Sequence, residues 1–357
     1  MLEKEMDIGP IRPPSEGGSH SLLIRATRNC PWNRCAFCAF NYRESRFQLR
    51  PVEDVIRDIN IVKGIEETTR EVSQKLGYGG ELNSHVLETL LSNHVGATSS
   101  PTFVTVINWL ASGGKTVFLQ DADSLIMKTD ELIEIIIYLK ASFPTIERIT
   151  SYARAKTLYK KTEEDLKALK KAGLSRLHVG LETGDDYLLN KVKKGITAQE
   201  HIEAGRKVIN AGIELSSYVI PGLGGLDLSM DHASNTAQVL NKINPHYIRS
   251  RPFVPRRGSP LFEEYEKGDF RLLSPHGIIS EIGMMVSALN VTSRFCFDHA
   301  VNATYRSDEG LVPLFDQRHE GYQLPDRKEE ILYIIAEGLQ VDESRYIRAE
   351  HLIDAML

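Results

Sequence analysis

Three cysteines stand close together near the start of the chain, Cys30, Cys35 and Cys38, directly after an apolar run. Thiolates at this spacing on one loop can bind three corners of an iron–sulfur cube and leave the fourth iron open for chemistry. A closed cluster or a tetrahedral zinc site needs one more ligand. The remaining cysteine, Cys296, lies far along the chain between two phenylalanines, which favours a buried apolar residue.

Structural zinc is the main alternative for this triplet. It requires a further ligand, and no histidine occurs between His20 and His85. A disulfide is less favoured, because the intervals are short and Met1–Gly18 has no apolar core segment typical of a signal peptide. We therefore expect a reducing, cytoplasmic compartment.

Short β-rich runs alternate with helical patterns along the chain, which is typical of parallel βα units. Six strands are predicted, over Leu22–Ala26, Thr116–Leu119, Arg148–Tyr152, Arg176–Leu181, Glu214–Ile220 and Tyr247–Arg251. Helices are predicted between them, over Glu131–Ala141, Glu163–Ala172, Ala198–Ala211 and Met230–Ile243. Thr197 with Glu200 three residues later predicts a capping box at the start of one helix.

The connection after the first strand is too long for one crossover helix. It predicts a helical insertion at about residues 51–113, with pieces over Pro51–Leu76, Glu81–Asn93 and Pro101–Ser112. The predicted fold is α/β: a partial (β/α)6 TIM-like barrel over residues 21–260, after a tail at residues 1–20. A mostly helical C-terminal cap is predicted over residues 261–357, with helices at His276–Leu289, Lys328–Gly338 and Glu343–Met356.

Polar side chains follow the predicted strands. In parallel barrels the functional groups gather at the loops where strands end. The residues at these positions are Asp121, Asp123, Arg154, Glu182, Arg249 and Arg251. A later polar cluster of Asp298, His299 and Asn302 could line the open end of the barrel and touch substrate, or it could be a self-satisfied turn.

The cysteine loop resembles that of the radical S-adenosylmethionine (SAM) superfamily. The usual spacing there is C-x3-C-x2-C after the first barrel strand, with an aromatic residue before the last cysteine. Phe37 occupies the aromatic place, and the first interval is one residue longer here. The segments Gly180–Asp185 and Asn190–Gly195 also resemble the fourth βα unit of the oxygen-independent coproporphyrinogen oxidase and methylthiotransferase branches.

The resemblance implies roles for particular residues. Glu182 would face SAM, and Lys194 would pair with its methionine carboxylate; the alternatives are a helix-end charge for Glu182 and an exposed surface lysine for Lys194. Ile220 and Gly224 would lie against the adenine. Asp121 and Asp123 stand where the family holds the methionine amino group, and they could equally cap the next helix. The candidates for contact with substrate are Arg154, Arg249, Arg251, Asp298, His299 and Asn302.

The resemblance also implies a reaction. SAM is cleaved reductively at a [4Fe–4S] cluster, and the resulting 5′-deoxyadenosyl radical takes hydrogen from a small organic substrate. An electron donor such as flavodoxin or ferredoxin is expected. Alternating Arg249 and Arg251 favour an anionic substrate or partner acids such as Asp298 and Glu182. Two other classes remain open: a zinc-stabilised barrel aldolase or isomerase, and a non-enzymatic iron–sulfur carrier.

Composition agrees with a globular enzyme. The 357 residues are 41% apolar, which is enough for a substantial core. The net charge of −5 argues against a nucleic-acid backbone as the main partner. The longest apolar stretch, Leu132–Leu139, is interrupted by Glu134 and is far shorter than the roughly 20 residues that span a membrane, so no membrane segment is expected.

Overall fold

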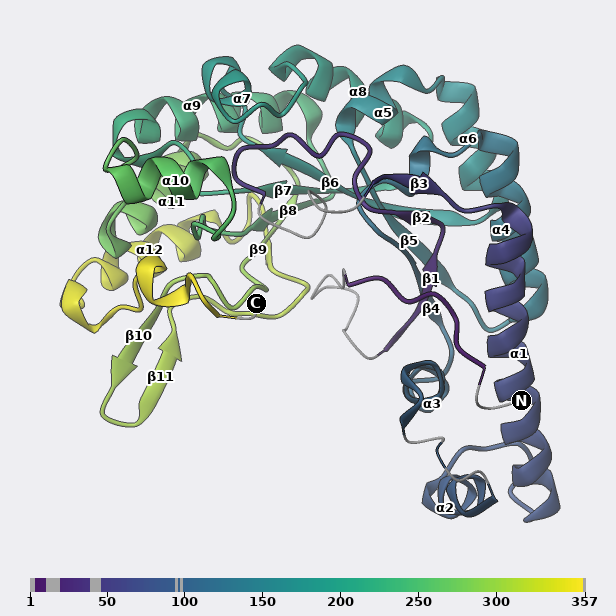
Figure 1. The fold of residues 1–357 in the computed structure, drawn as a ribbon. Coiled ribbons are helices and arrows are strands. Elements are labelled where there is room, and N and C mark those ends of the chain that lie inside the picture. The colour runs from purple at the N-terminus through teal and green to yellow at the C-terminus, as the bar shows by residue number, and fades with distance from the viewer. Residues whose placement is uncertain (1–3, 11–19, 39–45, 94–95, 97–98, 356–357) are drawn as a thin grey trace. The chain divides into compact units, whose positions relative to one another are not determined.

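The computed structural model describes residues 4–10, 20–38, 46–93, 96 and 99–355 (Figure 1). The chain divides into two compact units. The first consists of Met1–Pro31, Phe47–Tyr152 and Glu164–Arg176, and the second of Trp32–Arg46, Ala153–Glu163 and Leu177–Leu357. The division falls within the cysteine loop, since Cys30 belongs to the first unit and Cys35 and Cys38 to the second.

The first unit is built on three parallel strands. They are β1 (Ser21–Arg25), β4 (Thr116–Gln120) and β5 (Arg148–Ala153), with β4 between the other two. Their residues are almost all buried, as expected of parallel strands covered on both faces. The unit also contains a short antiparallel pair, β2 (Thr27–Arg28) and β3 (Gln48–Leu49).

Three helices fill the connection between β1 and β4, as the sequence predicts. They are α1 (Val52–Lys75), α2 (Ser84–Asn93) and α3 (Pro101–Ala111). Ser100 caps α3 by accepting a hydrogen bond from the Phe103 amide, and Pro101 occupies its first turn. The other helical elements of this unit are η3 (Ser124–Ile126), α4 (Thr129–Ser142) and most of α6 (Glu163–Ala172).

The second unit continues the parallel topology. Strand β6 (Leu174–Glu182) starts in the first unit and ends in the second, and it is followed in strand order by β7 (Glu214–Val219), β8 (Tyr247–Ser250) and β9 (Arg294–Cys296). Its helices are α5 (Ala155–Lys160), α7 (Asp186–Lys191), α8 (Ala198–Asn210), α9 (Gly225–Ile243), α10 (Pro260–Lys267), α11 (Pro275–Ala288) and α12 (Lys328–Gly338). The predicted capping box of Thr197 and Glu200 is present at the start of α8. The predicted mixed α/β fold with a parallel sheet is confirmed.

The C-terminal region is less helical than predicted. The short strand β9 pairs in parallel with β8, and β12 (Tyr322–Gln323) pairs antiparallel with β9. A hairpin of β10 (Thr304–Ser307) and β11 (Gly310–Pro313) follows β9 along the chain. These strands are two to four residues long, too short for an alternating pattern to reveal them.

The prediction of a helix over Glu343–Met356 is wrong. Within the described residues this segment forms two short 3₁₀ turns, η4 (Glu343–Arg345) and η5 (Ala349–Leu352). Between them Tyr346 is extended and buried, and the Ile347 amide donates to the Thr304 carbonyl at 2.9 Å. Pairing with the hairpin therefore outweighs the local helix preference. Residues 356–357 lie outside the described residues.

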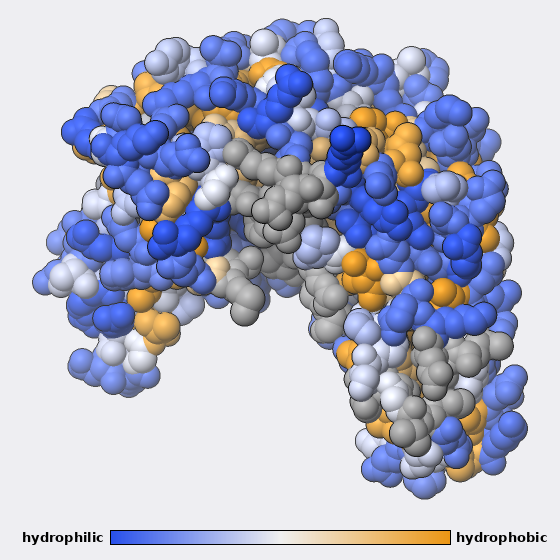
Figure 2. Space-filling model, in the orientation of Figure 1, coloured by the Kyte–Doolittle hydropathy of each residue, from blue (hydrophilic) through white to orange (hydrophobic). Residues whose placement is uncertain are grey.

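The face visible in Figure 2 is mostly hydrophilic, and its hydrophobic residues are scattered among hydrophilic ones. In the part of the chain that the structure describes, no helix is long and apolar enough to cross a membrane.

Candidate functional site

None of the three cysteines of the loop takes part in a disulfide, and all three are partly exposed, whereas Cys296 is buried. Burial of Cys296 is what its two phenylalanine neighbours predict. Among the described residues no His, Cys, Asp or Glu side chains gather in a group of three or more that could hold a metal ion. Cys30, Cys35 and Cys38 are accessible and outside any disulfide, so as a donor set they fit an iron–sulfur cluster, and their ligand role remains a prediction.

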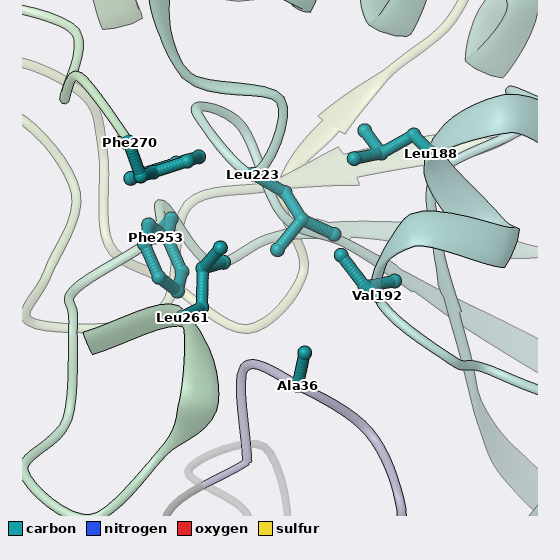
Figure 3. Packing of buried hydrophobic residues seen from close by; sticks show 7 residues of the cluster. All are labelled: Ala36, Leu188, Val192, Leu223, Phe253, Leu261 and Phe270. Atoms are coloured by element: carbon teal, nitrogen blue, oxygen red, sulfur yellow. The ribbon is translucent and has the colours of Figure 1, made fainter. Parts of the chain in front are cut away.

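Ala36 anchors the part of the loop that carries Cys35 and Cys38. Its amide donates to the Val192 carbonyl at 2.8 Å, and its carbonyl accepts from the Leu261 amide at 2.9 Å. Figure 3 shows its methyl group directed into a buried apolar cluster of the second unit. The other members of this cluster are Leu188, Val192, Leu223, Phe253, Leu261 and Phe270. Backbone bonds and apolar packing therefore fix the loop between two of its thiols.

Trp32 attaches the same loop to the turn after α7. Its indole Nε1 donates to the Lys193 carbonyl at 2.7 Å. The guanidinium groups of Arg34 and Arg154 lie 5.2 and 5.1 Å from its ring centroid. At Gly195, with φ of +75°, an added Cβ would stand 2.4 Å from the ring. Only glycine leaves room for this contact, and sequence reasoning missed Trp32 although it lies between the first two cysteines.

Glu182 and Lys194 meet as a nearly buried ion pair. The Lys194 Nζ lies 2.6 Å from the Glu182 carboxylate, and the side chains are 12% and 11% exposed. Gly180 provides the space, because a Cβ there would stand 2.0 Å from Glu182 Oε1 and 3.0 Å from Lys194 Nζ. The Lys194 ammonium is also 5.6 Å from the centroid of the Phe37 ring. The structure thus brings three of the predicted SAM residues together and rules out an exposed Lys194.

The electrostatics keep this lysine charged. Burial lowers the pKa of Lys194, but the negative charges of Glu182 and Cys35 outweigh that effect, so its pKa lies above the usual value. Glu182 has φ of +64°, which is costly for a residue with a Cβ and is concentrated at functional sites in proteins. A charged ammonium beside a strained strand-end carboxylate is suited to binding a zwitterionic ligand.

Arg154 is hydrogen-bonded to the backbone of Lys194. Its Nη2 donates to the Lys194 carbonyl at 3.1 Å. The nearby His201 is buried, and burial together with the charges of Lys194 and Arg154 lowers the pKa of its imidazole to about 3. His201 is therefore neutral at pH 7 and adds no positive charge to the group. Arg154 contacts the Lys194 carbonyl and the Trp32 ring in this structure, and its contact with substrate stays a prediction.

Asp121 sits in a separate network in the first unit. It follows β4 with φ of +79°, and its Oδ2 accepts from Arg25 Nε at 2.6 Å. Arg25 and Arg28 both donate to Asp7, at 3.0 and 2.6 Å. Burial raises the pKa of Asp121, and Arg25 opposes that rise. Asp123 precedes η3, but its side chain makes no capping hydrogen bond. Sequence reasoning missed Arg25, whose signal was its place at the end of β1.

The turn after β7 contains the two other predicted SAM residues. The Ile220 amide donates to the Glu182 carbonyl at 3.0 Å, which ties this turn to the end of β6. Gly222 has φ of +82°, and Gly224 is the N-cap of α9. Ile220 is partly buried against the cluster of Figure 3. Backbone bonding therefore sets the turn next to Glu182.

A buried acid of α11, Glu281, is hydrogen-bonded to the same turn. Glu281 accepts from the Gly222 amide at 2.6 Å and from the Ser229 hydroxyl at 2.5 Å. Its Oε1 lies 3.5 Å from His232 Nε2, while His232 Nδ1 bonds the Thr183 hydroxyl at 2.8 Å. Sequence reasoning did not single out either residue, because one acid and one histidine within helical patterns carry no local signal.

This arrangement predicts a pH effect on stability. Burial raises the pKa of Glu281 to about 7, so the folded chain takes up a proton that the unfolded chain releases near pH 4.5. The resulting destabilisation is absent below about pH 4.5, grows as the pH rises, and is complete above pH 7, with a size of about 3 kcal/mol. Glu281→Gln should remove it.

Denaturant unfolding of both proteins at pH 5 and pH 8 measures this difference. The wild type should lose stability relative to Glu281→Gln on going to pH 8. Burial lowers the pKa of His232 to about 4, and its opposite contribution is common to both proteins. A constant difference across this range would show that Glu281 is not protonated in the folded state.

Arg249 lies buried at the end of β8 and is fully engaged. Its Nε donates to the Ser216 hydroxyl at 3.0 Å, and its Nη1 forms an ion pair with Asp298. Asp298 also lies 3.0 Å from His319 Nδ1. The predicted pairing of a strand-end arginine with Asp298 is therefore present, and it leaves Arg249 occupied within the protein.

His299 and Asn302 form a hydrogen-bonded turn. The Asn302 amide donates to the His299 carbonyl at 3.0 Å, and the Val301 amide lies 3.3 Å from His299 Nδ1. Both side chains are buried, and Arg251 lies half-buried beyond the end of β8. The turn that the sequence analysis considered is therefore present, one oxygen of Asn302 has no partner among the described residues, and contact of these residues with substrate stays a prediction.

Comparison with known proteins identifies a family for the centre of the chain. Residues 103–235 match the family model described as the Radical SAM superfamily. The match includes Asp121, Glu182, Lys194 and the turn after β7, and it starts after the three cysteines. The cofactors of this superfamily, a [4Fe–4S] cluster and SAM, are those that the sequence predicts.

Individual relatives are distant. A tRNA uridine(34) acetyltransferase of Methanocaldococcus jannaschii is 24% identical over 110 residues, which are 30% of this chain and 20% of that protein. A tRNA-2-methylthio-N(6)-dimethylallyladenosine synthase of Hahella chejuensis is 27% identical over 251 residues, 70% of this chain and 46% of that protein. The chain thus spans less than half the length of both. The solved structure of methylornithine synthase aligns with 96% of this chain and 80% of its own, at 14% identity and a TM-score of 0.46.

Proposed function

Because the chain belongs to the radical SAM superfamily, we propose that it cleaves SAM reductively and uses the product to take hydrogen from a small organic substrate. The cluster and SAM, when bound, supply the chemistry: one electron breaks the sulfur–C5′ bond to give methionine and a 5′-deoxyadenosyl fragment, which becomes 5′-deoxyadenosine by accepting a substrate hydrogen atom. A small electron carrier of the flavodoxin or ferredoxin class would supply the electron.

The proposal rests on one observation above all, the buried ion pair of Glu182 and Lys194 next to Phe37 of the cysteine loop. In this proposal Cys30, Cys35 and Cys38 hold the cluster. Lys194 holds the methionine carboxylate, and Glu182 accepts from a ribose hydroxyl or from the amino group. The backbone of the turn at Ile220 and Gly224 would contact the adenine, and Asp121 and Asp123 stay the candidates that the sequence gives for the methionine amino group.

The protein's own groups would prepare the site rather than take part as acids or bases. Lys194 stays charged, and His201 stays neutral behind it, so the cationic charge is concentrated at one atom. Trp32 and Ala36 fix the cysteine loop against the Lys194 turn before any ligand binds. Such pre-organisation lowers the entropy cost of capturing SAM.

Two measurements on anaerobically purified, reconstituted protein test the proposal. Iron and sulfide analysis should find four of each per chain, following from the [4Fe–4S] assignment. Incubation with dithionite and SAM should then release methionine and 5′-deoxyadenosine, detected by mass spectrometry. Stoichiometric zinc without sulfide would instead support the aldolase or isomerase class, and a cluster whose spectrum SAM does not perturb would support an electron carrier.

A screen of candidate compounds is needed to identify the substrate. Two relatives are named for reactions on tRNA, so a tRNA pool belongs beside small molecules in that screen. The chain's net charge of −5 favours the small molecules.

A further inference from the structure

Arg251 differs from Arg249 and Arg257, two arginines close to it in the sequence. It follows β8 directly and is half-buried, and no acidic side chain pairs with it in the described part of the chain. Arg249, two residues earlier, is neutralised by Asp298, and the exposed Arg257 is neutralised by Asp354 at 2.6 Å. A half-buried guanidinium without a counter-charge has lost hydration and gained no anion in return.

A second cation lies close to Arg251. Arg256 is also half-buried, and its Nη1 donates to the backbone carbonyls of Leu352, Ile353 and Ala355, the last at 2.8 Å. Carbonyl groups accept these bonds but do not cancel the charge. Burial lowers the pKa of Arg256, and the charge of Arg251 lowers it further. The two guanidinium groups therefore repel each other.

Besides burial, the same two arginines also lower the pKa of His299. Burial lowers the pKa of its imidazole to about 4, followed by the charges of Arg251 and Arg256, with Asp298 opposing them. Asp298 is the acid facing this group, and it is already engaged by Arg249 and His319. The negative charge of Asp298 is therefore offset by Arg249. In the described part of the chain, no acid offsets the positive charges of Arg251 and Arg256.

Two polar atoms at the same strand end lack partners among the described residues. The Ser250 hydroxyl and the Oδ1 atom of Asn302 make no hydrogen bond, although the two residues are only 1% and 3% exposed. Asn302 is held in place by its Nδ2, which donates to the Ser250 and His299 carbonyls at 3.0 Å each. Buried polar groups without partners are costly, and they are typical of places where a ligand completes the bonding.

We propose that Arg251, with Arg256 and His299, forms an anion site at the end of β8 that binds the carboxylate or phosphate group of the substrate. This inference rests on the proposed function for what is bound, and it adds the chemical class. Arg251 would make the direct contact through its guanidinium fork. Arg256 would add charge, and neutral His299 would add one hydrogen bond. Ser250 and Asn302 would serve a hydroxyl or amino group beside the anion.

Isothermal titration of the full chain with sodium phosphate, and separately with sodium succinate, at constant ionic strength tests this site. The wild type should bind at least one of the two anions. Arg251→Ala should weaken that binding at least about tenfold, because a charge-assisted bond is lost. Arg251→Lys should retain part of it. The control Arg257→Ala removes an exposed arginine of the same segment and should change nothing.

The two anions distinguish the sources of the charge. Binding of phosphate alone indicates a phosphorylated substrate, and binding of succinate alone indicates a carboxylic acid. No binding by the wild type, or equal binding by a folded Arg251→Ala protein, overturns the anion site. SAM cleavage without substrate is measured on the wild type alongside these titrations. Anion binding in a wild type that never cleaves SAM would leave the site standing and defeat the proposed function.

Discussion

Cys35→Ala is expected to abolish both the brown iron–sulfur chromophore and SAM cleavage. Three thiolates are the minimum that holds a cube with one open iron, and the buried Cys296 cannot replace a loop ligand without leaving its place in the core. The change is small in volume, and Cys35 is partly exposed, so the fold should survive. Visible absorption near the charge-transfer bands, iron content and 5′-deoxyadenosine yield measure the effect.

The matched control is Cys296→Ala, a substitution of the same type outside the loop. It should keep the cluster and the turnover, at a modest cost in stability from lost packing. Full cluster content and activity in Cys35→Ala would remove the triplet from the metal site. Equal loss in both variants would point to a general folding defect.

Lys194→Ala is expected to weaken SAM binding by about 1.5–3 kcal/mol, or about 10- to 150-fold in Kd, with the cluster intact. The ammonium is the group assigned to the methionine carboxylate, and its loss also leaves the Glu182 carboxylate nearly buried without its cation. Equilibrium dialysis with labelled SAM on reconstituted protein gives the affinity directly.

Lys191→Ala is the control for charge alone. Lys191 is exposed on the preceding helix α7, and its contact is with the Phe270 ring. Its removal lowers the net charge by the same amount and should leave SAM affinity unchanged. If both variants bound SAM equally well, the carboxylate would be held elsewhere.

Local signals in the sequence predicted much of the fold. The capping box of Thr197 and Glu200 marks the start of α8, and the long interval after the first strand correctly predicted three helices. Strand β9 was expected only as an extended run before Asp298 and not counted among the six strands, because three residues define no period. The segment after Glu343 was wrongly predicted as a helix, since its extended Tyr346 depends on a partner strand about forty residues earlier in the chain.

The candidate site divides in the same way. Glu182, Lys194 and Phe37 stand in recognisable motifs, and the structure places them together. Arg25, Trp32 and Glu281 were missed because their partners lie far along the chain, and no local pattern encodes a pairing of that kind. The sequence predicted Asp121 as a site residue but did not indicate its partner Arg25. The ion pair between the two residues could therefore not be predicted.

Gly180 and Gly195 have a consequence for the variation that this protein tolerates. A methyl group at either position would overlap a functional side chain, the Glu182 carboxylate in one case and the Trp32 indole in the other. A library randomised at both codons and selected for SAM cleavage should therefore return glycine at both. Codons for exposed positions of α8, such as Gln199 and Glu203, should in contrast drift freely under the same selection. Two hydrogen atoms, in place of two side chains, thus limit which sequences can carry this site.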